Sequence, residues 1–123
     1  MAKICVIDDE PNLRLLYQSE FERMGHEVIC HANGREAYRS LPVDQPDLII
    51  LDIMMPEGDG LEFLSNVLVM HVGIPVIINS AYAQFKNDFV SWAAEAYVVK
   101  SSDLSELKEQ VHRVLFKFSM ATA

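Results

Sequence analysis

The chain has 123 residues, of which 50% are apolar and 23% are charged. This length and composition fit one compact domain, which we place at residues 1–123, and they are unlike those of disordered, collagen-like or disulfide-rich proteins. Ten basic residues against 18 acidic residues give a formal net charge of −8, so we expect no direct binding to nucleic acid or to anionic lipid.

The apolar segments predict neither export nor membrane insertion. Residues 1–7 run directly into three acidic residues, without the cleavage region of a signal peptide. The longest apolar region, residues 67–78, is interrupted by Gly73 and Pro75 and is shorter than the ~20 residues of a membrane helix. We therefore expect a cytoplasmic protein with no membrane partner.

Five short aliphatic runs alternate with longer segments in which apolar residues recur every three or four positions, a pattern typical of parallel α/β sheets. The predicted strands are residues 3–7, 27–31, 48–51, 75–79 and 96–99. They are rich in Val, Ile and Leu, as expected of strands buried on both faces. Cys5 and Cys30 lie in the first two strands, so we expect buried free thiols rather than a disulfide.

A helix is expected after each strand, which makes five helices. Helical spacing of apolar residues is clearest over residues 13–24, 61–72 and 104–118. Asn33, Asp59 and Asp103 each stand three residues before a Glu, which predicts helix N-caps at these three positions.

These elements predict a flavodoxin-like, doubly wound α/β fold with a five-stranded parallel sheet and five helices. By analogy with that fold, we expect the strand order 2-1-3-4-5. Ligands of such sheets bind beyond the carboxyl ends of the strands, at the switch point between strands one and three.

Polar residues follow the predicted strands at that edge of the sheet. Asp8 and Asp9 follow the first strand, Asp52 the third, Ser80 the fourth and Lys100 the fifth. Three carboxylates in one cleft would repel each other unless a cation lay among them. Oxygen ligands without His or Cys favour Mg²⁺, with Mn²⁺ as an alternative.

A metal, an ammonium and a hydroxyl suit the transfer of a phosphoryl group. Asp52 stands alone after the central strand and is the predicted nucleophile, which would form an acyl phosphate. Taken singly, Asp8 or Asp9 could instead cap the first helix, and Ser80 and Lys100 could be ordinary loop residues. Their coincidence at one edge of the sheet favours a shared function.

Four separated motifs resemble the receiver domains of two-component response regulators, of the chemotaxis-regulator kind. The motifs are VIDDE at residues 6–10, LDIMMPEGDG at 51–60, SA at 80–81 and YVVK at 97–100. The resemblance covers essentially the whole chain and implies that Asp52 accepts a phosphoryl group from the phosphohistidine of a sensor kinase or a histidine phosphotransfer protein.

The resemblance also implies a role for each remaining site residue. Asp9 and Asp52 would bind Mg²⁺ directly, together with the backbone carbonyl of Met54, and Asp8 would act through water. Ser80 and Lys100 would contact the phosphoryl oxygens.

The resemblance further implies a conformational switch at Ser80 and Tyr97. The Tyr97 side chain would turn inward, although without the resemblance an aromatic residue in a strand indicates packing. The face formed by the fourth helix, the fifth strand and the fifth helix would then contact an output domain or effector protein, or a second copy as a homodimer. Such a domain is a switch that catalyses only its own phosphorylation and dephosphorylation.

The sequence departs from the family pattern after Lys100, where Ser101 replaces the usual proline. We therefore expect a trans peptide bond and a different loop shape there. Met54 and Tyr82 lie two residues after Asp52 and Ser80, where side chains of this family overhang the phosphate. We predict that this bulky pair shields the phosphate and slows its hydrolysis.

Three alternative functions stay open. A degenerate receiver would act as a phosphorylation-independent interaction module, although every chemical position is filled. A magnesium-dependent phosphohydrolase with an aspartyl phosphate would carry a second Asp where this chain has Met54. A flavodoxin-like cofactor binder would need a Ser-, Thr- or Gly-rich loop after the first strand, where this chain is acidic.

Overall fold

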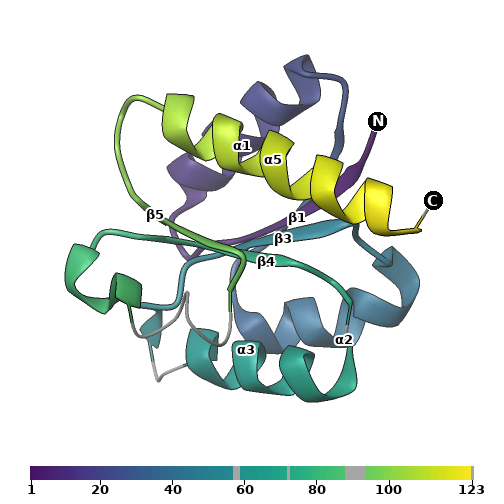
Figure 1. The fold of residues 1–123 in the computed structure, drawn as a ribbon. Coiled ribbons are helices and arrows are strands. Elements are labelled where there is room, and N and C mark those ends of the chain that lie inside the picture. Colours follow the sequence, from purple (N-terminus) through teal and green to yellow (C-terminus); the bar gives the residue numbers. More distant parts are fainter. Residues whose placement is uncertain (57–58, 72, 88–93, 123) are drawn as a thin grey trace.

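The computed structural model describes residues 1–56, 59–71, 73–87 and 94–122. It has one five-stranded sheet between two layers of helices (Figure 1). The strands are β1 (Lys3–Ile7), β2 (Glu27–His31), β3 (Leu48–Leu51), β4 (Val76–Ser80) and β5 (Ala96–Val99). The α-helices are α1 (Pro11–Arg23), α2 (Gly34–Asp44), α3 (Asp59–Met70) and α5 (Ser105–Thr122), and η2 (Ala83–Phe85) is a short 3-10 helix.

The sheet confirms the predicted α/β fold. All neighbouring strands are parallel, in the order β2-β1-β3-β4-β5. Four strands have the predicted bounds, and β4 begins and ends one residue later than predicted. Pro75 has no N–H to donate, so pairing with β3 begins at Val76. At the other end Ser80 still pairs with Val99 of β5.

The prediction of five helices is off by one. Over the described residues the structure has four α-helices, and η2 follows β4. In η2 the Lys86 N–H bonds to the Ala83 carbonyl, the tighter spacing of a 3-10 turn. The rest of the helix expected there falls on residues 88–93, outside the described part of the chain. None of the described helices is both long and apolar enough to cross a membrane.

One of the three predicted N-caps is confirmed: Asn33 Oδ1 accepts a hydrogen bond of 2.8 Å from the Glu36 N–H. Helix α5 begins at Ser105, so Asp103 lies one residue before the N-cap position, and its Oδ1 accepts a hydrogen bond of 2.9 Å from the Ser105 N–H. Asp59 is not a cap but the first residue of α3, and its carboxylate accepts a hydrogen bond from the Gly34 N–H of α2. The prediction failed because α2 and α3 pack closely enough for the carboxylate to reach the neighbouring helix.

Each face of the sheet has its own apolar core. Alternate residues of a strand point to opposite faces, so Ile4 and Val6 of β1 pack under α1 and α5, whereas Cys5 and Ile7 pack under α2 and α3 (Figure 1). Fully burying a Leu or Ile side chain stabilises the fold by about 1.5–3 kcal/mol. The two cores together hold the sheet between the two helix layers. Both cysteines are free, as predicted; Cys5 is buried, whereas Cys30 is only partly buried, unlike the prediction.

Candidate functional site

The carboxyl ends of the strands bring the predicted site residues to one edge of the sheet. Three of the strand pairings continue one hydrogen bond beyond the last apolar residue of a strand. Asp8 N–H donates to the His31 carbonyl, Asp52 N–H to the Ile7 carbonyl and Lys100 N–H to the Ser80 carbonyl, at 3.2, 2.9 and 2.7 Å. The sheet therefore fixes the backbone from which the Asp8, Asp52 and Lys100 side chains project.

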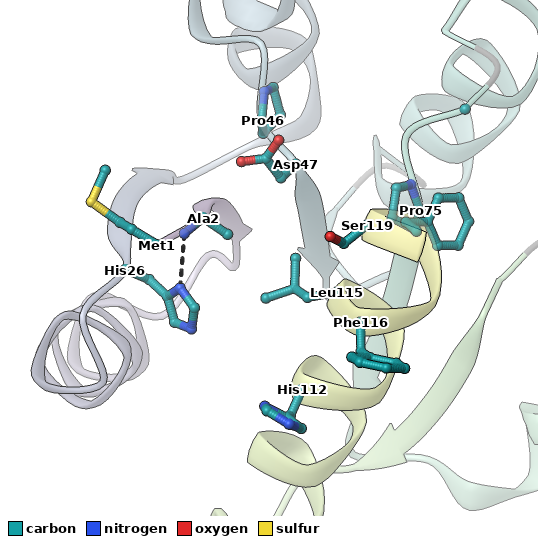
Figure 2. Close-up of a pocket in the computed structure, with 12 residues that line it drawn as sticks. Met1, Ala2, His26, Pro46, Asp47, Pro75, His112, Leu115, Phe116 and Ser119 are labelled. Atoms are coloured by element: carbon teal, nitrogen blue, oxygen red, sulfur yellow. Dashed lines mark hydrogen bonds between the residues drawn. The ribbon is translucent and has the colours of Figure 1, made fainter. Parts of the chain in front are cut away.

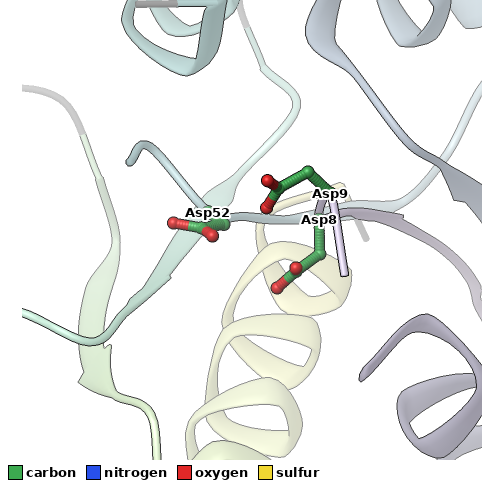
Figure 3. Close-up of side chains that lie close together, drawn as sticks. All are labelled: Asp8, Asp9 and Asp52. Carbon is green, nitrogen blue, oxygen red and sulfur yellow. The ribbon is translucent and has the colours of Figure 1, made fainter. Parts of the chain in front are cut away.

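Three carboxylates cluster at this edge (Figure 3). Asp8, Asp9 and Asp52 each offer an oxygen atom, and these atoms all lie within 4.8 Å of one another. Asp8 is 2% exposed and Asp52 is 5% exposed, whereas Asp9 faces solvent. A hollow of about 720 Å³ lies beside Asp9 and is also lined by Met55 and Pro56, so the cluster is open to solvent on this side.

Lys100 joins two of these carboxylates. Its Nζ lies 2.9 Å from Asp8 Oδ2 and 3.0 Å from Asp52 Oδ2. Partial burial by itself would lower the pKa of Lys100, but hydrogen bonds and charges from Asp8 and Asp52 outweigh burial and raise it. Burial raises the pKa of Asp8, against the opposing effects of the Glu10 amide and of Lys100. Lys100 is therefore a fixed cation at neutral pH.

Backbone amides hold the other oxygen atom of each buried carboxylate. Asp8 Oδ1 accepts a hydrogen bond of 2.9 Å from the Glu10 N–H, and Asp52 Oδ1 accepts one of 2.9 Å from the Met54 N–H. The N-cap of α1 is Glu10, which makes no side-chain cap bond. Capping of α1 therefore does not account for Asp8 or Asp9, and both buried carboxylates are held in defined orientations.

The donor set fits a hard divalent cation. Three carboxylates and one ammonium carry a formal charge of −3 + 1 = −2, which one such ion neutralises. The donors are carboxylate oxygens, the ligands that Mg²⁺ prefers. Both oxygens of Asp8 and both oxygens of Asp52 are already engaged within the chain, whereas Asp9 faces solvent. Asp9 is therefore the carboxylate best placed to bind an ion directly.

Ser80 and Tyr97 both bind the peptide groups of Tyr82. Ser80 Oγ accepts a hydrogen bond of 3.2 Å from the Tyr82 N–H, and the Tyr97 hydroxyl donates to the Tyr82 carbonyl. Ser80 is 0% exposed and Tyr97 is 3% exposed, so Tyr97 lies in a buried orientation. Both contacts use backbone atoms of Tyr82, which no sequence pattern reports.

One contact near the site was not predicted from the sequence. Asn79 is a polar residue inside the buried strand β4, and its side chain binds Tyr17 of α1. The amide within an aliphatic run is visible in the sequence, but its partner is not. The trans Lys100–Ser101 bond agrees with the prediction, since the described residues contain no cis peptide bond.

A second hollow, of about 580 Å³, lies at the opposite, amino-terminal edge of the sheet (Figure 2). Pro46 and Pro75 line it from the segments that lead into β3 and β4, and His112 and Phe116 line it from α5. His26 Nδ1 accepts a hydrogen bond of 3.1 Å from the Ala2 N–H at its rim. This hollow is separated from the carboxylate cluster by the length of the strands.

Comparison with known proteins points to one family. A family model described as the response regulator receiver domain matches residues 4–112. The chain is 31% identical over 117 residues to Sporulation initiation phosphotransferase F of Bacillus subtilis, covering 92% of this chain and 93% of that protein. It is 36% identical over 120 residues to Regulatory protein AtoC of Escherichia coli, covering 96% of this chain. The chain spans only 26% of the length of AtoC.

Solved structures give the same result. The response regulator protein TrrA from Thermotoga maritima, in complex with Mg²⁺ and BeF, is 40% identical with a TM-score of 0.85, over 93% of this chain and 99% of that one. TrrA in complex with the histidine kinase ThkA is 41% identical with a TM-score of 0.84, over 94% of this chain and 99% of that one.

Proposed function

This chain belongs to the receiver domains of two-component response regulators, and from that premise we propose that Asp52 accepts a phosphoryl group from the phosphohistidine of a sensor kinase or a histidine phosphotransfer protein. The observation that carries the proposal is the position of Asp52, which lies within 4.8 Å of two further carboxylates and 3.0 Å from the Lys100 ammonium. That TrrA was solved with a histidine kinase supports this class of partner.

In the proposed reaction the Asp52 carboxylate attacks phosphorus, and the bond between phosphorus and the histidine nitrogen breaks. The product is an acyl phosphate on Asp52. Lys100 would stabilise the negative charge of the phosphoryl oxygens, and the Ser80 hydroxyl would donate a hydrogen bond to one of them. The hydrogen bond from the Met54 N–H orients the Asp52 carboxylate for the attack.

We assign Mg²⁺ binding to Asp9, Asp52 and the backbone carbonyl of Met54, with Asp8 acting through water. When bound, the ion would neutralise charge on the carboxylates and on the phosphoryl oxygens. The solvent-facing position of Asp9 supports its direct role. The carboxylate donors would also accept Mn²⁺, so the metal dependence of the reaction is measured with both ions.

We propose that phosphorylation is read through Ser80 and Tyr97. A phosphoryl group adds about −1.5 to −2 charges and strong acceptor oxygens, which would draw the Ser80 hydroxyl away from Tyr82. Because the Tyr97 hydroxyl binds the carbonyl of that same residue, a movement at Ser80 would reach β5. To shift the domain from 1% to 99% active, phosphorylation would have to favour the active state by about 5.5 kcal/mol. We propose that phosphorylation shifts the equilibrium in part and that binding of a partner completes the shift.

The proposal covers residues 1–123 as one receiver domain that acts as a switch rather than as an enzyme with an external substrate. Its output face would be β5, α5 and the helix predicted between β4 and β5, of which residues 88–93 lie outside the described part of the chain. This face would contact an output domain, an effector protein or a second copy. We propose no direct contact with nucleic acid or membrane. A cytoplasmic location is supported by the two free thiols, because cysteines stay reduced in that compartment.

We further propose that Met54 and Tyr82 slow hydrolysis of the phosphate. The two residues are 47% and 44% exposed, and they follow Asp52 and Ser80 by two residues. We expect the phosphorylated Met54→Asn, Tyr82→Ala variant to lose its phosphate several-fold faster than wild type. The loss is measured by intact mass after the phosphate donor is removed, and equal rates would contradict the idea.

The first experiment is intact mass spectrometry after incubation with acetyl phosphate and Mg²⁺. We expect a gain of about 80 Da in wild type, none in Asp52→Asn, and none in wild type with EDTA. A gain in Asp52→Asn would overturn the assignment of Asp52. No gain in either protein, from acetyl phosphate or from a phosphorylated kinase, would favour the phosphorylation-independent interaction module.

A further inference from the structure

Two polar side chains meet in the apolar layer between α1 and the sheet. Asn79 Nδ2 donates a hydrogen bond of 2.8 Å to Tyr17 Oη, across 62 residues of sequence. Tyr17 is 1% exposed and Asn79 is 2% exposed. A buried amide or hydroxyl is costly unless it is paired, so this bond determines how the two residues face each other.

Asn79 connects the bond to the site through the backbone of β4. It directly precedes Ser80, whose carbonyl accepts the hydrogen bond of 2.7 Å from the Lys100 N–H. Successive side chains of a strand point to opposite faces, so Asn79 faces α1 while Ser80 faces the other way. A shift of Asn79 would therefore move both the Ser80 hydroxyl and the backbone that carries Lys100.

Tyr17 connects the same bond to α1, which is joined to the site at a second point. Arg14, about one turn earlier, donates a hydrogen bond of 2.7 Å from Nη1 to the Asp8 carbonyl. Thus α1 holds the end of β1 through Arg14 and the end of β4 through Tyr17. These are two of the strand ends that form the site, since Asp8 follows β1 and Ser80 ends β4.

The hydrogen bond between Asn79 and Tyr17 restricts how β4 and α1 can pack against each other. Two apolar side chains would fill the same space without the cost of burying an amide and a hydroxyl, but they could slide past each other. A hydrogen bond in a low-dielectric interior is satisfied in one arrangement and makes other arrangements unfavourable. The pair thus restricts the position of β4 relative to α1 more narrowly than apolar contacts do.

We infer that Tyr17 and Asn79 are positioning residues for phosphoryl transfer: their buried hydrogen bond holds the end of β4 against α1 and thereby places the Ser80 hydroxyl and the Lys100 ammonium beside Asp52. The inference rests on the proposed function of Asp52. The pair acts through Ser80 and Lys100, and it makes α1 part of the support of the site.

The test compares wild type with Tyr17→Phe, Asn79→Leu and the double variant, using acetyl phosphate and Mg²⁺ as the probe. Phosphorylation is followed by intact mass, and folding by urea unfolding. Each single variant leaves a buried polar group without its partner and should lower the urea midpoint. The double variant removes both groups and should recover most of that loss.

The phosphorylation rate should distinguish a positioning role of the Tyr17–Asn79 bond from a purely stabilising role. The double variant should keep a maximal phosphorylation rate about tenfold or more below wild type, because small displacements of reacting groups strongly lower rates. The acetyl phosphate concentration at half-maximal rate should change little. Tyr38→Phe is the matched control, since Tyr38 lies on the other face of the sheet against Phe63 and His71, and it should react at the wild-type rate.

A double variant that regains the wild-type urea midpoint and also reacts at the wild-type rate would overturn the inference, because the bond would then be purely structural. If the double variant does not unfold cooperatively, Tyr17→Phe decides, since it keeps the ring; an unchanged maximal rate in folded Tyr17→Phe overturns the inference equally. If wild type itself gains no mass, the proposed function fails and the inference fails with it. This outcome differs from one in which wild type and the variants are phosphorylated equally fast, which overturns the inference alone.

Discussion

The ammonium nitrogen of Lys100 lies 3.0 Å from Oδ2 of Asp52, 48 residues earlier in the chain. Asp8 shares the same ammonium, and both carboxylates are buried. Removing one partner of such a group leaves an uncompensated buried charge, which costs about 3–5 kcal/mol. We therefore expect Lys100→Met to lower the free energy of unfolding in EDTA by about 3 kcal/mol, as measured by urea unfolding.

Mg²⁺ should reduce this loss, because the cation replaces part of the missing positive charge. Lys108→Met is the matched control. Lys108 pairs with Glu20 at 2.7 Å, but their side chains are 35% and 21% exposed, so solvent screens the pair. We expect a much smaller and Mg²⁺-independent loss for this variant, and equal losses for the two lysines would contradict the prediction.

Gly60 allows α3 to lie directly against the backbone that follows Asp52. A Cβ atom at this position would lie 2.6 Å from Ile53 Cα and 2.8 Å from the Asp52 carbonyl oxygen. Helix propensity alone would make Gly60→Ala stabilising by about 1 kcal/mol, whereas this overlap should make it destabilising by about 1–3 kcal/mol. The sign of the change in urea unfolding decides between the two effects.

In Gly60→Ala the added Cβ should displace the backbone at Asp52 and Ile53, and this displacement should also slow phosphorylation of Asp52. Gly25→Ala is the control. Gly25 has φ +95 with no atom within 4 Å of an added Cβ, so that variant should lose about 1 kcal/mol from backbone strain and be phosphorylated at the wild-type rate. A stabilised Gly60→Ala would show that α3 can move away at no cost.

His26 should make stability depend on pH. Burial lowers the pKa of His26, and the charges of the chain amino terminus and of His112 lower it further. The Ala2 N–H also donates to His26 Nδ1, which must stay unprotonated to accept that bond. The unfolded chain therefore binds a proton more readily than the folded chain. The free energy of unfolding should fall as pH decreases through the ordinary histidine pKa of ~6.5 and then through the lower folded value.

This dependence is measured by urea unfolding between about pH 8 and pH 5.5, with His26→Gln as the comparison. At the upper limit His26 is neutral in both states, and the pH-independent cost of the substitution is read there. Over the acidic range the slope should be smaller in His26→Gln than in wild type. Identical slopes would show that another group is responsible.

The two cysteines should differ in reactivity. Burial raises the pKa of Cys5 to about 12, with smaller contributions from Asp44 and Cys30, and burial also raises the pKa of Cys30. Cys5 is 0% exposed, whereas Cys30 is partly exposed. Because thiolates are the reactive form, we expect a disulfide reagent to label Cys30 slowly and Cys5 only when the protein opens.

Labelling is followed by intact mass in the folded protein and in urea, where both thiols should react quickly. Cys5 packs under α2 and α3 while Cys30 packs against the core under α1 and α5, so an oxidant should not join them within one folded chain. An intramolecular disulfide, detected by a peptide map without reduction, would contradict this arrangement.

The sequence by itself determined the sheet and the chemical identity of its acidic edge. Aliphatic runs buried on both faces form strands with little ambiguity, and parallel strands necessarily bring the residues that follow them to one edge. Asp8, Asp9, Asp52 and Lys100 could therefore be predicted to meet there. The sequence pattern predicted an α-helix after β4, but the chain there begins with the 3-10 helix η2. Local sequence patterns therefore did not distinguish a 3-10 turn from the start of an α-helix.

Only the tertiary structure decided which atoms of these residues meet. Lys100 bridges Asp8 and Asp52, Asp59 binds α2 instead of capping α3, and Tyr82 holds Ser80 and Tyr97 through its peptide groups. These contacts depend on how closely separate elements pack and on backbone atoms that every residue type carries. Local sequence patterns report propensity and burial, but the partner of a hydrogen bond across the fold is set by the three-dimensional packing of the elements.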